Sequence, residues 1–163
     1  MVIVDSSALI HLSAIARFTL LKELYGQLTV TPAVWREVAE QGKDRTGVPD
    51  LEAARLQGWL EVRMPANQPL LQSLRHELDE REGEVIALAV EHPGSLALLD
   101  ESNARRIATS LGVEKTGAIG VLMRAKLEAG SSPLRPELDK LRAEAGFWIE
   151  DDLYRAVLEA ARE

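Results

Sequence analysis

Apolar residues follow two patterns along the chain, short continuous runs and longer stretches with an apolar residue at every third or fourth position. The runs predict buried strands, over residues 2–4, 28–30, 60–64, 96–99 and 113–115. The periodic stretches predict amphipathic helices, over residues 8–25, 32–42, 49–57, 79–91, 102–111, 117–129, 133–145 and 152–163. We expect a break in the first helix near Phe18, a last strand over residues 147–149, and loops over residues 43–50 and 65–69.

The alternation of strands and helices favours an α/β fold, a three-layer α/β/α sandwich with a mostly parallel central sheet. The length suits one domain over residues 1–163, and no linker divides the chain. In open sheets of this kind, functional sites gather beyond the carboxyl ends of the strands. Asp5 and Asp100 each follow directly on a predicted strand, so we expect them at the same edge of the sheet.

Composition narrows the available chemistry. The chain contains no Cys and three His, and 26 acidic against 19 basic side chains give it a net charge of −7. The lack of Cys excludes disulfides, zinc ribbons, iron–sulfur clusters and thiol catalysis, which leaves carboxylates as the main reactive groups. The acidic balance argues against sequence-independent coating of DNA. No basic leader and no long apolar span is visible, so we expect a cytoplasmic protein without a membrane contact.

Four acids stand out from ordinary surface charge, Asp5, Glu37, Glu84 and Asp100. Each also has a plainer interpretation, because Asp5 and Asp100 can cap the following helices, Glu37 can be solvated, and Glu84 can favour a helix start. If the fold brings the four together, their hard oxygen ligands suit Mg²⁺ or Mn²⁺ better than Zn²⁺. Such a site suits the hydrolysis of phosphodiesters.

These acids lie within segments that resemble the PIN-domain family, whose members include ribonucleases and VapC-type toxins of toxin–antitoxin pairs. The matching segments are VIVDSS at residues 2–7, PAVWREV at 32–38, GEVIALA at 83–89, LLDE at 98–101 and TGAIGVL at 116–122. The resemblance implies a PIN-like sandwich in which Asp5, Glu37, Glu84 and Asp100 bind the metal. Many PIN nucleases carry a further acid a few residues past the last Asp, where Asn103 offers only a neutral oxygen.

Several residues are candidates for supporting roles. Ser7 can orient Asp5 or simply cap a helix, and Thr116 can contact a phosphate or cap the next helix. Residues 77–91 have a net charge of −5 and residues 101–126 of +3, so the basic stretch can carry an RNA backbone towards Asp100. Arg105 in that stretch and Arg36 are candidates for phosphate contact, or solvated side chains.

Three further side chains are assigned to the interior or to an interface. His11 lies on the apolar stripe of the first predicted helix, which favours an interior histidine over a metal ligand. Trp35 and Trp148 are interpreted as core or interface residues rather than as platforms for stacking bases.

Two functions are open from the sequence. The first is a Mg²⁺- or Mn²⁺-dependent endoribonuclease of the PIN type, a toxin that acts on RNA and is held inactive by a small antitoxin. The second is a non-catalytic nucleic-acid-binding or regulatory module that keeps the acids as a weak metal or partner site. A phospho-acceptor receiver domain fits less well, since the paired acids expected after its first strand are missing. A homodimer is possible in either case.

Overall fold

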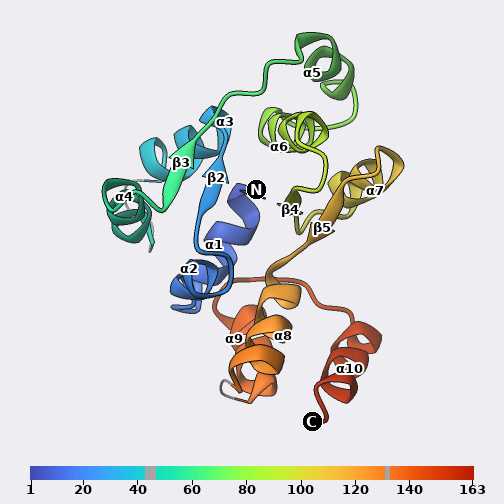
Figure 1. Ribbon diagram of the computed structural model, residues 1–163. Coiled ribbons are helices and arrows are strands. Elements are labelled where there is room, and N and C mark those ends of the chain that lie inside the picture. Colours follow the sequence, from blue (N-terminus) through green and yellow to red (C-terminus); the bar gives the residue numbers. More distant parts are fainter. Residues whose placement is uncertain (43–46, 131–132) are drawn as a thin grey trace.

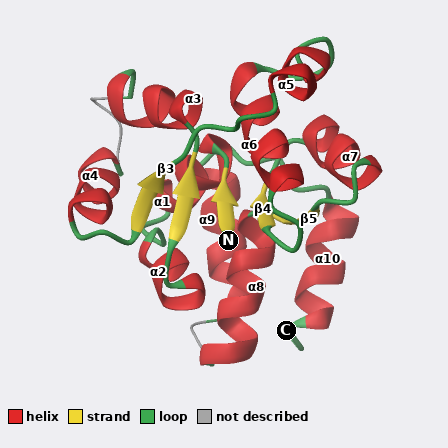
Figure 2. Ribbon diagram, turned by 45° about the horizontal axis from the view of Figure 1, so that its top comes forward, coloured by secondary structure: helices red, strands yellow, loops and turns green. Residues whose placement is uncertain are grey.

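The strands form one parallel sheet in the computed structural model, which describes residues 1–42, 47–130 and 133–163 (Figure 1). Its strands are β1 (Val2–Val4), β2 (Leu28–Val30), β3 (Leu60–Val62), β4 (Leu96–Leu98) and β5 (Glu114–Thr116). They lie in the order β3-β2-β1-β4-β5, and every pair is parallel; the arrows of β1, β2 and β3 point the same way in Figure 2. The predicted α/β/α fold with a mostly parallel sheet is therefore confirmed.

The strand order reverses between β1 and β4, which are neighbours although the chain between them runs through β2 and β3. Val4 is in register with Leu98, and the next backbone amide, that of Asp5, donates to the Leu98 carbonyl at 3.0 Å. Asp5 and Asp100 therefore leave the sheet at the same edge. A reversal of this kind opens a crevice beyond the carboxyl ends of the two strands, where ligands of α/β proteins usually bind.

Helices cover both faces of the sheet. The helical elements are α1 (Ser6–Ala14), α2 (Thr19–Tyr25), α3 (Pro32–Trp35), the π-helical segment η1 (Arg36–Glu40), α4 (Val48–Leu56), α5 (Gln68–Leu74), α6 (Glu80–Glu91), α7 (Ser102–Ser110), α8 (Ala118–Ala129), α9 (Leu134–Ala143) and α10 (Asp151–Ala160). Helix α6 packs on β1 and β4, with α5 and α7 beside it, while α1 packs against α8 and α9 on the other side (Figures 1 and 2). Within the described residues, no helix is long and apolar enough to cross a bilayer.

Strands β1 and β4 are continuous apolar runs, as expected for strands that are buried on both faces. Ile3, Val4, Ala97 and Leu98 are 0% exposed, because helices cover both of their faces. On α6, the buried stretch includes Val85, Ile86, Ala87 and Leu88, so this helix forms the centre of one layer. The central strands are therefore rigidly held, and they position the residues that follow them.

Several predicted elements differ from the structure. The predicted helix over residues 8–25 is two helices, and the break expected near Phe18 lies between Ala14 and Thr19, where Ala16 has a φ of +56°. Helix α5 was not predicted, because part of its sequence was assigned to a loop and the rest to no element. Its start is capped by Asn67, whose side chain accepts a hydrogen bond from the Leu70 amide. The expected strand over residues 147–149 is absent, because that segment pairs with no strand among the described residues. Part of the expected loop, residues 43–46, lies outside the described residues.

Candidate active site at the carboxyl edge of the sheet

Asp5 lies at the centre of the edge, where it caps α1. Its Oδ2 accepts hydrogen bonds from the Ser7 hydroxyl at 2.8 Å and from the Ser7 amide at 3.4 Å. Ser7 therefore both orients the carboxylate and shares in the helix cap. Asp5 is 1% exposed, and within the described residues its Oδ1 has no hydrogen-bond partner. Burial raises the pKa of this carboxyl, although the Ser7 hydroxyl and Arg81 act in the opposite direction.

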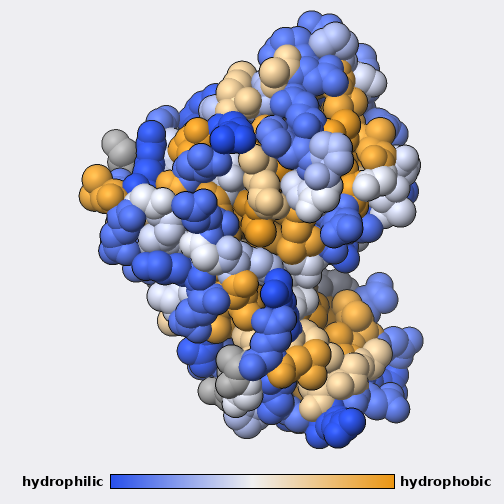
Figure 3. Space-filling model, viewed as in Figure 1, coloured by the Kyte–Doolittle hydropathy of each residue, from blue (hydrophilic) through white to orange (hydrophobic). Residues whose placement is uncertain are grey.

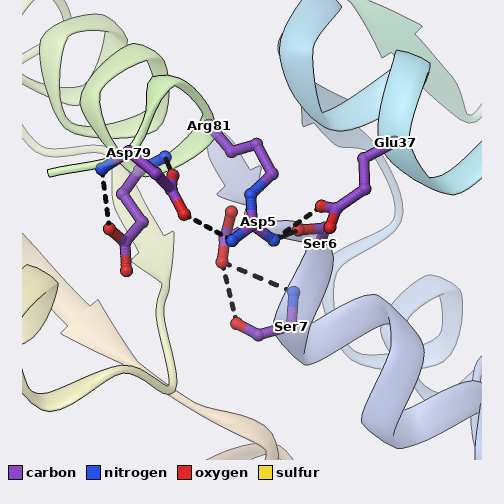
Figure 4. A network of polar contacts seen from close by, with 7 residues as sticks. Asp5, Ser6, Ser7, Glu37, Asp79 and Arg81 are labelled. Carbon is purple, nitrogen blue, oxygen red and sulfur yellow. Dashed lines mark hydrogen bonds and ion pairs between the residues drawn. The ribbon is translucent and has the colours of Figure 1, made fainter.

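Arg81, from the first turn of α6, reaches into the middle of the acids (Figure 4). Its guanidinium donates to Glu37 at 2.6 Å, to Asp79 and to the Ser6 hydroxyl. Burial opposes the charge on Arg81, but the bonds to Asp79 and Glu37 and the field of Asp5 outweigh it and raise the pKa of the guanidinium. The edge of the sheet is thus a place where a positive charge is stabilised by several carboxylates.

Glu37 reaches Arg81 from the other side of this edge. It lies in the π-helical segment η1, which follows α3 without a break. Segments of π-helix are rare and frequently mark functional sites. The start of α3 is held by Glu84, whose Oε2 accepts a hydrogen bond from the Ala33 amide at 2.9 Å. Glu84 is 5% exposed, so this bond replaces water at an otherwise unpaired helix terminus.

In the structure, Glu84 makes a contact that the sequence did not predict. Its carboxylate holds the start of α3, which continues directly into the segment that carries Glu37. Glu82, two residues earlier on α6, is the acid whose charge interacts with Asp5 and Arg81. Because two residues on a helix point about 200° apart, only one of the two acids can face this edge.

Glu82 is a candidate that the sequence reasoning missed. It is 8% exposed and forms a capping box with Asp79, each side chain accepting from the other residue's amide. Burial and the negative charges of Asp79 and Asp5 raise the pKa of Glu82 to about 7. One signal was available in the sequence, since Glu82 precedes Val85, Ile86 and Ala89 at helical spacing and so lies on the apolar face of α6.

We expect stability in metal-free buffer to fall as the pH rises from 4.5 to about 7, the ordinary and the raised pKa of Glu82. The folded protein keeps the Glu82 proton over this interval while the unfolded chain releases it, so unfolding becomes more favourable. Glu82→Gln should raise the melting temperature above pH 7 and leave it unchanged below pH 4.5. The control is Glu80→Gln, at an exposed position of the same helix turn; an equal response of both variants would contradict the assignment.

Asp100 is held by two groups on the opposite side of the crevice from Glu37. Its Oδ1 accepts from the Ala118 amide at the start of α8, at 2.8 Å, and its Oδ2 lies 2.9 Å from Nδ1 of His11. The Asp100 side chain is 4% exposed. A Cβ on Gly117 would overlap Asp100 Oδ1, so glycine is required for the carboxylate to lie over the helix start. His11 is an interior histidine, as expected, and its partner is one of the candidate acids.

The remaining sequence candidates divide into two groups. Asn103 donates to the Glu77 carbonyl at 2.7 Å and Arg36 pairs with Glu80 at 3.2 Å, so neither is directed at Asp5 or Asp100. Arg105 and Thr116 line a cavity with Asp100, which keeps them beside the crevice.

The acids surround Arg81 rather than forming a ready metal centre. Over the described ranges of the chain, no three Asp, Glu or His side chains are gathered closely enough to hold a metal ion. The donor set still fits a hard divalent cation, because the available ligands are carboxylate oxygens and the buried Asp5 Oδ1 lacks a partner among the described residues. Asp5 would be the central ligand, and Glu37, Asp100 and the α6 acids Glu82 and Glu84 would have to move closer to it to complete a metal site.

Two tryptophans differ in their surroundings. Trp35 packs partly buried against the core, with the Arg55 guanidinium 4.5 Å from its ring centre. Trp148 is 86% exposed, so of the two predicted assignments, core or interface, the core is wrong and the interface stays a prediction. It lies between residues whose contacts hold the backbone.

Comparison with known proteins gives one clear result. Residues 1–163 match the family DUF3368, which is described as a PIN domain. The comparison with curated proteins finds no match. PIN domains have a nuclease-type, nucleic-acid-binding fold, in keeping with acids at the carboxyl edge of a parallel sheet. The family match over the entire sequence, together with the parallel α/β/α architecture, shows that the chain belongs to the PIN-domain family.

Proposed function

We propose that the protein is a metal-dependent endoribonuclease, and that it acts in the cytoplasm as the toxin of a toxin–antitoxin pair. The observation that carries the proposal is the convergence of Asp5, Glu37 and Glu82 on one positive charge, that of Arg81, at the reversal point of the sheet. Carboxylates placed so closely repel one another unless a cation lies among them. A catalytic divalent ion is one such cation.

Mg²⁺ or Mn²⁺, when bound, supplies a water of lowered pKa and neutralises charge on the scissile phosphate. The protein's own contribution is to hold its carboxylates in place before the ion arrives. Ser7 orients Asp5, and His11 with the Ala118 amide orients Asp100. Glu84 anchors α3 and thereby places Glu37, so we assign Glu84 a positioning role.

A divalent ion should stabilise the fold. At a hundredfold excess over its Kd, Mg²⁺ or Mn²⁺ adds about 2.7 kcal/mol to the free energy of unfolding, because it binds the folded state alone. Thermal melts in EDTA and in rising concentrations of each ion measure this. Asp5→Asn should abolish the effect, while Asp50→Asn, at an exposed position on α4, should retain it. Melting temperatures indifferent to both ions would refute the metal site.

One observation favours a second function. Arg81 already neutralises the acids, so the chain can be stable as a non-catalytic nucleic-acid-binding module in which Arg81 is the permanent cation. Such a module would bind RNA without cleaving it and would be insensitive to divalent ions. The same melts, together with a cleavage assay, separate the two functions. A partner's Arg could also bind these carboxylates, which is how an antitoxin would block the site.

A further inference from the structure

An open cavity of about 520 Å³ lies directly beside Asp100. Its walls come from the end of β5, the start of α7, the start of α8 and the segment that leads into α10, and they include Arg105, Lys115, Trp148 and Leu153. In Figure 3, the outline of the molecule narrows between the part that carries α7 and the part that carries α10. The cavity falls in the size range of small-molecule and cofactor sites.

Trp148 is presented to this cavity by a well-anchored piece of chain. Phe147 before it packs edge-on against the His11 ring, with ring centres 4.6 Å apart, and Ile149 after it is 4% exposed. The Arg142 guanidinium also donates to the Ile149 carbonyl at 2.6 Å. The contacts of residues 147 and 149 hold the backbone on either side of Trp148, and Trp148 lines the cavity together with Phe147. A large, rigid aromatic face is thus held in water, 86% exposed.

The two cations of the cavity form no ion pair within the described part of the chain. Among the described residues, neither Lys115 nor Arg105 has a carboxylate within ion-pair distance, whereas Arg17, Arg36, Arg63, Arg81, Arg106, Arg124, Arg142 and Arg155 each have one. Arg105 donates one bond, to the Leu99 carbonyl at 2.8 Å, which fixes its direction and leaves its other donors available. Glu150 lines the cavity from the α10 side, so the positive wall is that of α7 and β5.

We propose that this cavity binds an unpaired nucleotide of a single-stranded RNA, with the base stacked on Trp148 and the backbone phosphates at Lys115 and Arg105. This inference rests on the proposed function and names the form of its substrate. An exposed aromatic face beside unpaired cations is the combination that proteins use to hold single strands, since stacking serves the base and the cations serve the phosphates. A duplex is excluded, because its bases are already stacked on one another.

Binding is measured in EDTA, so that no cleavage contributes. The probe is a labelled oligouridylate of about ten nucleotides, and its Kd is followed by fluorescence anisotropy. Trp148→Ala should weaken binding about 10-fold, whereas Trp148→Phe should keep most of the affinity because stacking survives. Lys115→Gln should lower the slope of log Kd against log salt concentration by about 0.7, the value for one phosphate contact with a single strand.

Matched controls lie on other parts of the surface. Leu56→Ala removes an apolar side chain that is 90% exposed on α4, and Lys140→Gln removes an exposed charge on α9. Both should bind like the wild type. Equal weakening by Trp148→Ala and Leu56→Ala would overturn the proposal, as would a duplex binding as tightly as the single strand. Unchanged RNA affinity combined with altered self-association of Trp148→Ala would instead make the cavity a protein interface.

The experiments test the nucleotide cavity and the proposed nuclease activity separately, so that either proposal can be refuted while the other holds. Trp148-dependent binding in EDTA, without cleavage in Mg²⁺ or Mn²⁺, supports the nucleotide cavity and refutes the nuclease. Cleavage that depends on Asp5 but is unaffected by Trp148→Ala, in kcat and in KM, supports the nuclease and refutes the cavity.

Discussion

We expect the replacement of Asp5 by asparagine to remove the proposed RNA cleavage while leaving the fold intact. The loss should be at least about a thousandfold in kcat, because a metal-binding carboxylate supports several kcal/mol of charge stabilisation in the transition state. The amide oxygen of Asn can still accept the Ser7 bonds, and the replacement removes a charge that is 1% exposed. We therefore expect a melting temperature in EDTA at or above that of the wild type.

The measurement uses a fluorogenic RNA with Mg²⁺ or Mn²⁺, with Asp50→Asn as the matched control at an exposed position. Growth of a bacterial host gives a second readout, in which the wild type arrests growth when expressed alone and Asp5→Asn does not. Cleavage by Asp5→Asn at the wild-type rate would assign the activity to another site or to a contaminant. Cleavage in vitro without growth arrest would keep the nuclease and refute the toxin.

We expect the replacement of Arg81 by methionine to make the stability of the protein depend on a divalent ion. In EDTA the free energy of unfolding should fall by about 1–2 kcal/mol, between the values for a surface and a buried ion pair, because Glu37 and Asp79 are partly exposed and lose their counter-charge. Mn²⁺ should restore most of this loss. Its Kd should also be about tenfold lower than for the wild type, in which the ion must first displace Arg81 from Glu37 and Asp79, a difference of about 1.4 kcal/mol.

Arg36→Met is the matched control, since the Arg36–Glu80 pair lies on the surface, 46% and 53% exposed. Pairs of this kind contribute about 0–1 kcal/mol, so the variant should melt near the wild type with or without Mn²⁺. If Mn²⁺ stabilises the wild type and Arg81→Met equally, the ion and Arg81 do not share the same carboxylates. If it stabilises neither, Arg81 is the permanent cation of a non-catalytic module.

The strands of this site and the acids that follow them can be predicted from short stretches of the sequence. A continuous apolar run that ends at an acid indicates a buried strand followed by a residue at the edge of the sheet. Two such runs, which end at Asp5 and Asp100, predicted that these acids lie at the same edge. The pairing of Ser7 with Asp5 is also local, because the two residues are separated by one position. The predicted break near Phe18 follows from the same short-range pattern, whereas α5 was missed because its start depends on an Asn cap within a proline-containing loop.

The contacts that complete the site connect residues far apart in the sequence. His11 and Asp100 are separated by 89 positions and Arg81 and Glu37 by 44, so no periodicity reports their contact. Trp148 illustrates the same limit, because an aromatic residue beside Phe147 has the composition of a core strand, although its side chain is exposed in the structure.

The sequence by itself determined the parallel α/β architecture, the four strand-edge and helix acids as candidates, and a chemistry of oxygen ligands without sulfur. Only the tertiary structure decided which acid of α6 faces Asp5. Glu82 and Glu84 are equivalent in composition and lie in the same helix turn, and the choice between them depends on how α6 is rotated against β1 and α3. That rotation is set by packing of the buried face of α6, which is a property of the assembled layers and not of the helix alone.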